Sequence, residues 1–168
     1  MTALEIQGKA AKAASRRLAV CSTQEKNAAL LAIARALESQ KDRILSANNV
    51  DMENAVKSGM KKSMQDRLAL TPARIDGIVD GVRQVAALPD PIGEAVSMVR
   101  RPNGLIIAQI RVPIGVIAMI YEARPNVTVD SAVLCLKSGN AAILRGGKEA
   151  FESNKALVDI MREAIAEA

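Results

Sequence analysis

The fold is decided by the apolar run Ile114-Gly-Val-Ile-Ala-Met-Ile120 and by a shorter run downstream, Ala141-Ala-Ile-Leu144. Neither run alternates between apolar and polar residues, which is typical of strands that are buried on both faces. Between them, residues 126–138 carry apolar side chains at helical spacing, and Gly139 ends that helix. A final helix is predicted over residues 148–168. Strand, helix, strand and helix in this order predict a βαβα unit with two parallel strands and a right-handed crossover.

The chain upstream of this unit is helical in character as far as residue 88. Residues 2–20 are good helix formers throughout. Ser22-Thr-Gln-Glu25 is a capping box that starts a second helix, and Thr71-Pro72 starts another. Between these two starts, one apolar stripe is predicted from Leu30, Ile33, Leu37 and Ile44. We therefore predict an N-terminal helical part over residues 1–88.

A β-hairpin is predicted between the helical part and the βαβα unit. The proline-rich stretch 88–93 breaks the helical pattern, and residues 95–112 then form two arms around Asn103-Gly104, a pair that tolerates the positive φ of a tight turn. Alternation in the second arm predicts one covered and one solvated face. The fold class is therefore α/β, with residues 113–168 forming an incomplete sheet, because two parallel strands are not stable alone.

Composition excludes several classes of protein. The 168 residues include no His and no Trp, so a Ser-His or Cys-His catalytic pair and a histidine metal site are excluded within them. Tyr121 and Phe151 are the only aromatic residues, which argues against a platform that stacks nucleic-acid bases. The formal net charge of +5 fits small anionic ligands. The N-terminus carries no apolar core of signal-peptide length, and the strongest apolar run, Ile114–Ile120, is far shorter than a membrane span. We therefore expect no metal, no nucleic-acid partner, no membrane contact and a cytoplasmic location.

Two loops follow the predicted parallel strands. Tyr121–Asn126 comes after the first strand and Arg145–Lys148 after the second. Ligands of open parallel sheets bind at the carboxyl ends of the strands, and a helix N-terminus beside glycine and basic residues favours a phosphate. The alternatives are a tight turn with solvated basic residues at Gly146-Gly147-Lys148, a helix cap at Asn126 and a surface charge at Arg124. For Arg124, the functional interpretation is a clamp on a carboxylate or a phosphate.

Three segments resemble one enzyme family. They are Arg111–Asp130, which contains Tyr121-Glu-Ala-Arg-Pro-Asn-Val-Thr128, then Cys135-Leu-Lys-Ser-Gly-Asn-Ala-Ala-Ile-Leu-Arg-Gly-Gly-Lys-Glu149, and Asp66-Arg-Leu-Ala-Leu-Thr-Pro-Ala-Arg74. Together they resemble the γ-glutamyl phosphate reductases, also called glutamate-5-semialdehyde dehydrogenases, of the aldehyde dehydrogenase superfamily. The resemblance covers essentially the whole chain, which is similar to the N-terminal portion of such an enzyme.

The resemblance implies a reaction and a set of site residues. The family reduces γ-glutamyl phosphate with NADPH to glutamate-5-semialdehyde and phosphate, in proline synthesis. Asn126 falls at the oxyanion-hole asparagine of the superfamily, and Arg124 is our candidate substrate-binding residue. The residues expected at the cofactor are Ile120 and Tyr121, which would border its groove, and Arg145, Gly146, Gly147 and Lys148, which would receive its adenine-side ribose. An arginine suits a 2′-phosphate there, because its planar fork matches a phosphate.

The resemblance also implies partners and a missing group. In the superfamily, the hairpin around 106–112 belongs to the oligomerisation element, so a homo-oligomer is expected, and glutamate kinase is a further expected partner. The family's nucleophilic cysteine lies in a catalytic domain that these residues do not include, and neither Cys21 nor Cys135 aligns with it. We therefore expect no reductase activity from the chain alone. The alternative is a stand-alone, non-catalytic module for nucleotide binding or assembly.

Overall fold

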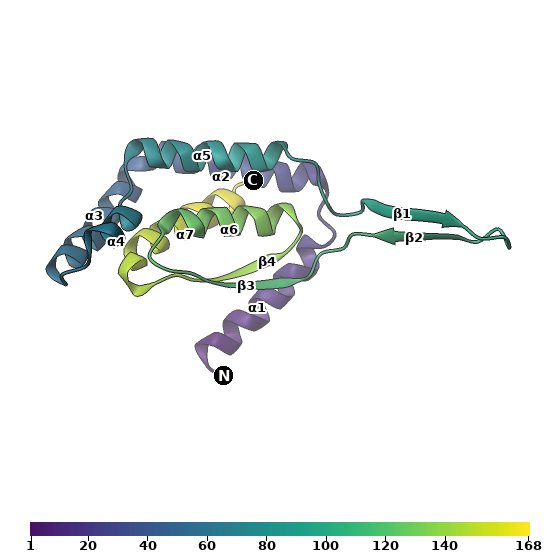
Figure 1. The fold of residues 1–168 in the computed structure, drawn as a ribbon, viewed down its shortest axis with the longest axis horizontal. Coiled ribbons are helices and arrows are strands. Elements are labelled where there is room, and N and C mark those ends of the chain that lie inside the picture. Colours follow the sequence, from purple (N-terminus) through teal and green to yellow (C-terminus); the bar gives the residue numbers. More distant parts are fainter.

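The computed structural model describes residues 1–168, in which helices form a body and a hairpin projects from it (Figure 1). The elements, in chain order, are α1 (Ala3–Leu18), α2 (Thr23–Ser39), α3 (Lys41–Lys57), α4 (Lys62–Leu68), α5 (Pro72–Ala87), β1 (Ala95–Arg100), β2 (Ile106–Ile110), β3 (Val116–Ile120), α6 (Pro125–Lys137), β4 (Ala141–Arg145), the short 3-10 helix η1 (Lys148–Ala150) and α7 (Phe151–Ala166). No helix is long and apolar enough to cross a membrane.

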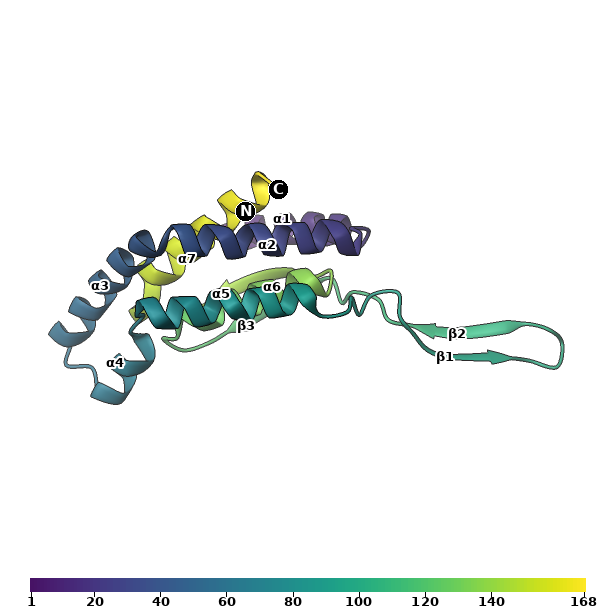
Figure 2. The ribbon, with the colours of Figure 1, turned by 90° about the horizontal axis from the view of Figure 1, so that it is seen from above.

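The core lies between four helices. α2 and α5 run alongside each other, and α6 and α7 pack against them (Figure 2). The largest side chains in this core are fully buried, and they include Leu30, Ile33, Leu37, Ile75, Val129, Leu157 and Ile160. Burial of this apolar surface is the main favourable contribution to the stability of the body.

The predicted helix starts are confirmed. The Ser22 hydroxyl accepts a hydrogen bond from the Glu25 amide, and the Glu25 carboxylate accepts one from the Ser22 amide. Thr71 caps α5, with Pro72 in the first turn. The apolar stripe that ends at Ile44 runs over two helices, because the backbone leaves helical geometry at Gln40. Ile44 is nevertheless buried in the same core.

The two parallel strands form as predicted, but their predicted burial is wrong. β3 pairs with β4 in parallel, with Val116 opposite Ala141 and Ile120 opposite Arg145. α1 and α6 both contact β4, and Figure 1 shows them on opposite sides of the sheet. β3 lies farther out and is half-buried to exposed along its length. The apolar residues of β3 predict a strand that is buried on both faces, but no part of this chain covers them fully.

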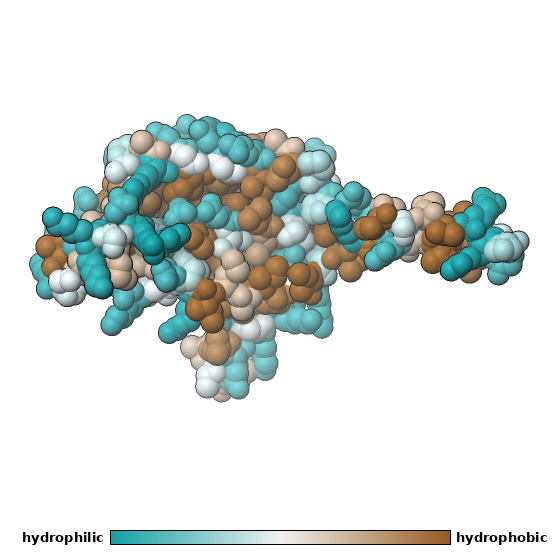
Figure 3. Space-filling model, viewed as in Figure 1, coloured by the Kyte–Doolittle hydropathy of each residue, from teal (hydrophilic) through white to brown (hydrophobic).

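The predicted hairpin also forms, but neither of its faces is covered. β1 and β2 pair antiparallel around Asn103-Gly104, and Gly104 has the positive φ that the turn needs. Every residue of both strands is exposed, so the predicted covered face is wrong for this chain. The physical reason is that the hairpin extends away from the body and no helix of the chain packs on it (Figure 1). Figure 3 shows apolar side chains along the hairpin and over the region of β3.

A buried polar cluster joins the body to the base of the hairpin. The Lys26 ammonium is 3% exposed and pairs with Asp90, which also accepts hydrogen bonds from the Thr23 hydroxyl and the Ile92 amide. Beside it, the buried Lys137 ammonium donates to the Asn27 side chain and to a backbone carbonyl of α5. Since buried charges need partners, these contacts fix where the chain leaves α5.

Candidate functional site

The two predicted loops lie side by side at the carboxyl ends of β3 and β4. The Tyr121 amide donates to the Arg145 carbonyl at 3.1 Å, which extends the pairing of the strands into the loops. Ile120, at the end of β3, is 84% exposed, and Tyr121 is half-buried. The structure therefore confirms that these loops meet at one edge of the sheet.

Gly146 and Gly147 allow the loops to approach this closely. A Cβ atom on Gly146 would lie 2.3 Å from Asn154 Nδ2 and 3.1 Å from the Tyr121 ring. A Cβ atom on Gly147 would lie 3.2 Å from the Ala123 amide nitrogen. A side chain at either position would therefore crowd the neighbouring loop, and the two glycines favour this close packing.

A chain of three side chains braces this edge of the sheet. The Thr128 hydroxyl donates to Asn154 Oδ1 at 2.7 Å and contacts the Tyr121 hydroxyl at 2.6 Å. Because the threonine hydroxyl has a single hydrogen, Tyr121 donates to Thr128. The roles of Thr128 and Asn154 could not be predicted from the sequence, because each contact joins separate parts of the chain: the loop after β3 with α6, and α6 with α7. Their role is to hold Tyr121 in place.

Arg145 and Lys148 are exposed cations at this edge. Neither takes part in any of the ion pairs of the structure. The N-termini of α6 and η1 lie in the same two loops, and no side chain caps either one. Unpaired cations and free backbone amides together fit an anionic group such as a phosphate.

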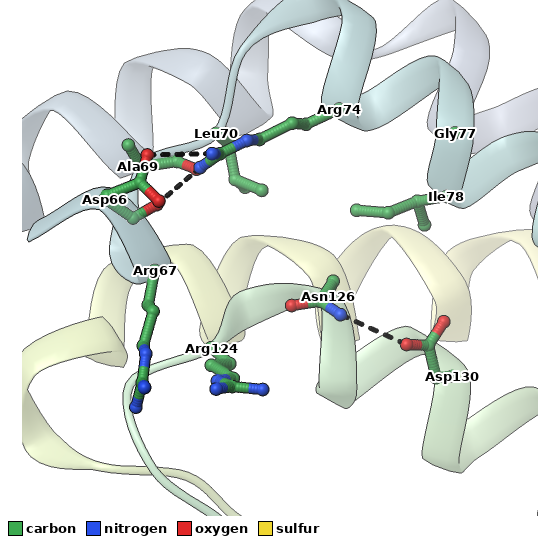
Figure 4. A pocket seen from close by; sticks show the side chains of 10 residues that line it. All are labelled: Asp66, Arg67, Ala69, Leu70, Arg74, Gly77, Ile78, Arg124, Asn126 and Asp130. Atoms are coloured by element: carbon green, nitrogen blue, oxygen red, sulfur yellow. Dashed lines mark hydrogen bonds and ion pairs between the residues drawn. The ribbon is translucent and has the colours of Figure 1, made fainter. Parts of the chain in front are cut away.

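Arg124 and Asn126 are not grouped with Arg145; they line a separate pocket on the other side of the first loop. The pocket has a volume of about 460 Å³ and lies between the N-terminus of α6 and the α4–α5 turn (Figure 4). Its lining consists mainly of charged residues together with a few apolar ones, namely Asp66, Arg67, Ala69, Leu70, Arg74, Gly77, Ile78, Arg124, Asn126 and Asp130. No role in a site could be predicted from the sequence for the residues that α4 and α5 contribute.

Asn126 does not cap its helix. The N-cap of α6 is Arg124, without a side-chain bond, and Asn126 lies inside the first turn behind Pro125. Its Nδ2 donates to Asp130 Oδ2 at 3.2 Å (Figure 4). This bond turns the amide nitrogen toward Asp130 and leaves the second N–H of the amide free. The alternative of a simple helix cap at Asn126 is therefore wrong.

Asp130 is the acidic group next to this amide. The residue is exposed overall, yet desolvation raises the pKa of its carboxyl, and the hydrogen bond from Asn126 offsets this only in part. No cation pairs with it. A positively charged ligand group would therefore be stabilised beside Asp130.

The three guanidinium groups of the pocket differ in their partners. Arg74 donates to Asp66 Oδ1 at 2.9 Å and to the Ala69 carbonyl at 2.8 Å, which ties the α4–α5 turn together. Arg67 reaches Glu122 at 3.4 Å. The Arg124 guanidinium takes part in none of the ion pairs of the structure, and Figure 4 shows it below Asn126. Of the three guanidinium groups, only that of Arg124 has no partner within the chain.

Cys135 is unsuited to nucleophilic chemistry. Cys135 is buried in α6, and desolvation raises the pKa of its thiol. Cys21 is half-buried, and its Sγ donates to the Arg17 carbonyl at 3.4 Å. Because the thiolate is the reactive form, a raised pKa keeps Cys135 inert.

Comparisons with known proteins agree with this fold. No protein-family model matches the chain. A curated gamma-glutamyl phosphate reductase of Carboxydothermus hydrogenoformans is 58% identical over 157 residues, which cover 94% of this chain and 38% of the relative. The crystal structure of gamma-glutamyl phosphate reductase from Thermotoga maritima superimposes with a TM-score of 0.97 at 46% identity, over 99% of this chain and 40% of that one.

A more distant structure shows the fold alone. A putative aldehyde dehydrogenase from Bacillus subtilis has a TM-score of 0.73 at 18% identity, over 97% of this chain and 34% of its own. The predicted α/β class and the resemblance to the reductases are therefore confirmed. The chain spans about two fifths of the length of the curated relatives it matches, which covers the loops and the pocket described above.

Proposed function

We infer that the loops of this chain bind NADPH and orient gamma-glutamyl phosphate for reduction. The inference proceeds from homology, because the chain is homologous to the N-terminal portion of gamma-glutamyl phosphate reductase. The products of the proposed reaction are glutamate-5-semialdehyde, phosphate and NADP⁺. The observation that carries the proposal is the placement of Asn126 and Arg124 in one pocket, beside the loop that continues β3.

Asn126 is proposed to stabilise negative charge on the acyl oxygen of the substrate. One N–H of its amide donates to Asp130, and the second is free to donate to an oxygen in the pocket. A donor held in place before the reaction stabilises charge as it develops, without reorganisation. Arg124 is proposed to bind an anionic group of the same substrate, because its guanidinium has no other partner.

The edge formed by the two loops is proposed to hold the cofactor. Arg145 and Lys148 would contact phosphate or ribose groups, while Gly146 and Gly147 let the loops pack closely, and Ile120 and Tyr121 would border the groove. When bound, NADPH supplies the hydride. The residues of this chain bind and orient it, and the hydrogen bond from Tyr121 to Thr128 keeps the ring in position.

A second candidate function, assembly, is favoured by the hairpin. Both faces of β1 and β2 are exposed although the strands are rich in apolar residues, among them Met98, Ile106 and Ile110. Apolar surface of this kind marks an interaction site. A homo-oligomer that buries the hairpin is therefore proposed together with the enzymatic function. Glutamate kinase stays a prediction from the resemblance.

The test uses a chimera in which this chain replaces the homologous stretch of the Thermotoga maritima reductase. NADP⁺ reduction with glutamate-5-semialdehyde and phosphate, the reverse of the proposed reaction, reports activity. Asn126→Ala should lower kcat by about 100- to 1,000-fold. The matched control Asn49→Ala changes an exposed asparagine of α3 and should leave kcat unchanged. An active chimera that tolerates Asn126→Ala would contradict the assignment.

A further inference from the structure

We propose that the pocket between α4, α5 and α6 recognises the amino-acid end of the substrate as a zwitterion, with Asp130 binding its α-ammonium group and Arg124 its α-carboxylate. This rests on the proposed function, since gamma-glutamyl phosphate carries both groups. It adds Asp130 as a specificity-determining residue and gives Arg124 a defined ligand group.

Asp130 has the properties of a site for a cation. Its carboxylate lines the pocket, has no positively charged partner, and uses one oxygen, Oδ2, to accept from Asn126. A carboxylate accepts several hydrogen bonds, so Oδ1 is free for an ammonium group. Desolvation that raises the pKa of this carboxyl would be offset by a bound cation.

Arg124 has the properties of a site for a carboxylate. The pocket holds two other arginines, but Arg74 is bound to Asp66 and to backbone carbonyls, and Arg67 reaches Glu122. The planar guanidinium of Arg124 is therefore the only one of the three with no partner in the chain, and it matches a carboxylate in two parallel hydrogen bonds. One unpaired acid and one unpaired base in a single pocket match an α-amino acid.

The length of the substrate fits this arrangement. Three carbon–carbon bonds separate its acyl carbon from its α-carbon, a span of about 4 Å when extended. With the acyl oxygen on the Asn126 amide, the α-ammonium group lies within reach of Asp130, whose Oδ2 is 3.2 Å from that same amide nitrogen. Gly77 of α5 leaves the opposite wall open, because a Cβ atom there would meet nothing within 4 Å.

The test compares three aldehydes in the chimera, with NADP⁺ and phosphate. Glutamate-5-semialdehyde carries both charged groups, 5-oxopentanoate lacks the amine, and 4-aminobutanal lacks the carboxylate. Asp130→Asn should lower kcat/KM by about 10- to 100-fold for the two amines and by less than about 2-fold for 5-oxopentanoate. The asparagine keeps an oxygen that accepts from Asn126, so the amide stays in position.

Arg124→Gln should give the complementary pattern. It should lower kcat/KM by about 10- to 100-fold for the two carboxylates and leave 4-aminobutanal within about 2-fold. The matched controls, Asp159→Asn on α7 and Arg35→Gln on α2, change charges outside the pocket and should leave all three values unchanged. An equal loss on all three aldehydes, or a loss on none, would overturn the proposal.

A binding measurement separates this proposal from the proposed function. Titration of the ¹⁵N-labelled chain with millimolar L-glutamate should shift amide resonances at the start of α6 and in the α4–α5 turn. Asp130→Asn and Arg124→Gln should each abolish the shifts, and Arg35→Gln should retain them. A chimera without turnover, combined with intact glutamate shifts, would refute the proposed function alone. Absence of glutamate-dependent shifts in the wild-type chain would refute the subsite.

Discussion

The helical body and the hairpin use apolar residues in opposite ways. In the body, Leu37 is fully buried between helices that all belong to this chain. In the hairpin, Ile107 is 48% exposed, and no helix approaches it. Both residues lie in well-formed secondary structure with the expected hydrogen bonds. The difference shows that local pattern and turn chemistry predict the pairing of the hairpin strands, whereas covering their side chains requires surfaces from elsewhere.

The site lies at the end of the helical body opposite the hairpin, where α4 and the start of α6 meet (Figure 1). Asn126 and Asp130 belong to α6, which packs in the core, while Ile120 belongs to a strand with little cover. The pocket is therefore built on a helix that packs in the core, whereas the edge beside β3 has little cover. Substitutions in the helical body and substitutions in the hairpin should therefore differ in their effect on the free energy of unfolding.

The largest effect is expected from Leu37→Ala. The substitution removes buried methyl groups and leaves a cavity, so the free energy of unfolding should fall by about 3–5 kcal/mol. The matched change Ile107→Ala in the hairpin should cost less than about 0.5 kcal/mol. Urea denaturation followed by circular dichroism measures both values. Equal losses would contradict the division between a closed body and an open hairpin.

The next effect concerns the junction between the two regions. Asp90→Ala leaves the Lys26 ammonium buried without its partner and should lower the free energy of unfolding by about 3 kcal/mol. Asp80→Ala is the control, because that carboxylate is mostly exposed and pairs with Arg83 on the surface. A loss at Asp90 no greater than the loss at Asp80 would show that the junction adds nothing to stability.

The junction should also respond to pH. Burial alone would raise the pKa of the Asp90 carboxyl, but hydrogen bonds led by that from Lys26 outweigh it, and the net pKa is lowered. A carboxyl group whose pKa is lower in the folded state than in the unfolded state stabilises the fold at pH values above its unfolded-state pKa, which is about 4. This stabilisation is lost as the pH falls through the folded-state pKa. Acid titration of stability should therefore show a loss below about pH 4 that Asp90→Asn reduces. Identical acid profiles would contradict the assignment.

Two glycines should respond in opposite directions. Gly146→Ala places a methyl group against Asn154 and the Tyr121 ring and should cost about 1–2 kcal/mol. Gly81→Ala, in α5, meets open space and should add about 0.5–1 kcal/mol. Thermal unfolding of the two variants gives the signs directly. A neutral Gly146→Ala would mean that the loops have room to separate.

The smallest effect on the stability of the body is expected from Ile106→Lys in the hairpin. The side chain is already half exposed, so the free energy of unfolding should change by less than about 0.5 kcal/mol. Self-association should fall sharply, because a charge would enter the proposed interface. Sedimentation velocity at several concentrations measures this. A wild-type chain that stays monomeric at every concentration would remove the proposed role of the hairpin.

Much of the fold could be predicted from local signals. The capping box at Ser22, the proline at the start of α5 and the Asn103-Gly104 turn act within a few residues, and each formed as expected. The burial of β3 could not be predicted in the same way. An apolar run such as Ile114–Ile120 indicates that a strand needs cover, but it does not say which segment provides it.

The candidate site could likewise be predicted from the sequence only in part. The meeting of the Tyr121 and Arg145 loops follows from parallel pairing and could be predicted. The pocket could not, because Arg74 reaches it from a helix that begins about fifty residues upstream of α6. Asp130 could have been found, since it lies one helical turn after Asn126 and faces the same side of α6.

If the edge beside β3 and β4 is a working cofactor site, the chain should bind NADPH by itself. Titration of the chain with NADPH, followed by cofactor fluorescence, measures this binding. We expect weak, saturable binding that Arg145→Ala weakens by about 10-fold, because a charge-assisted hydrogen bond is lost. Arg35→Ala, an exposed arginine of α2, should leave the affinity unchanged. No saturable binding, or equal affinity for wild type and Arg145→Ala, would contradict a cofactor site at this edge.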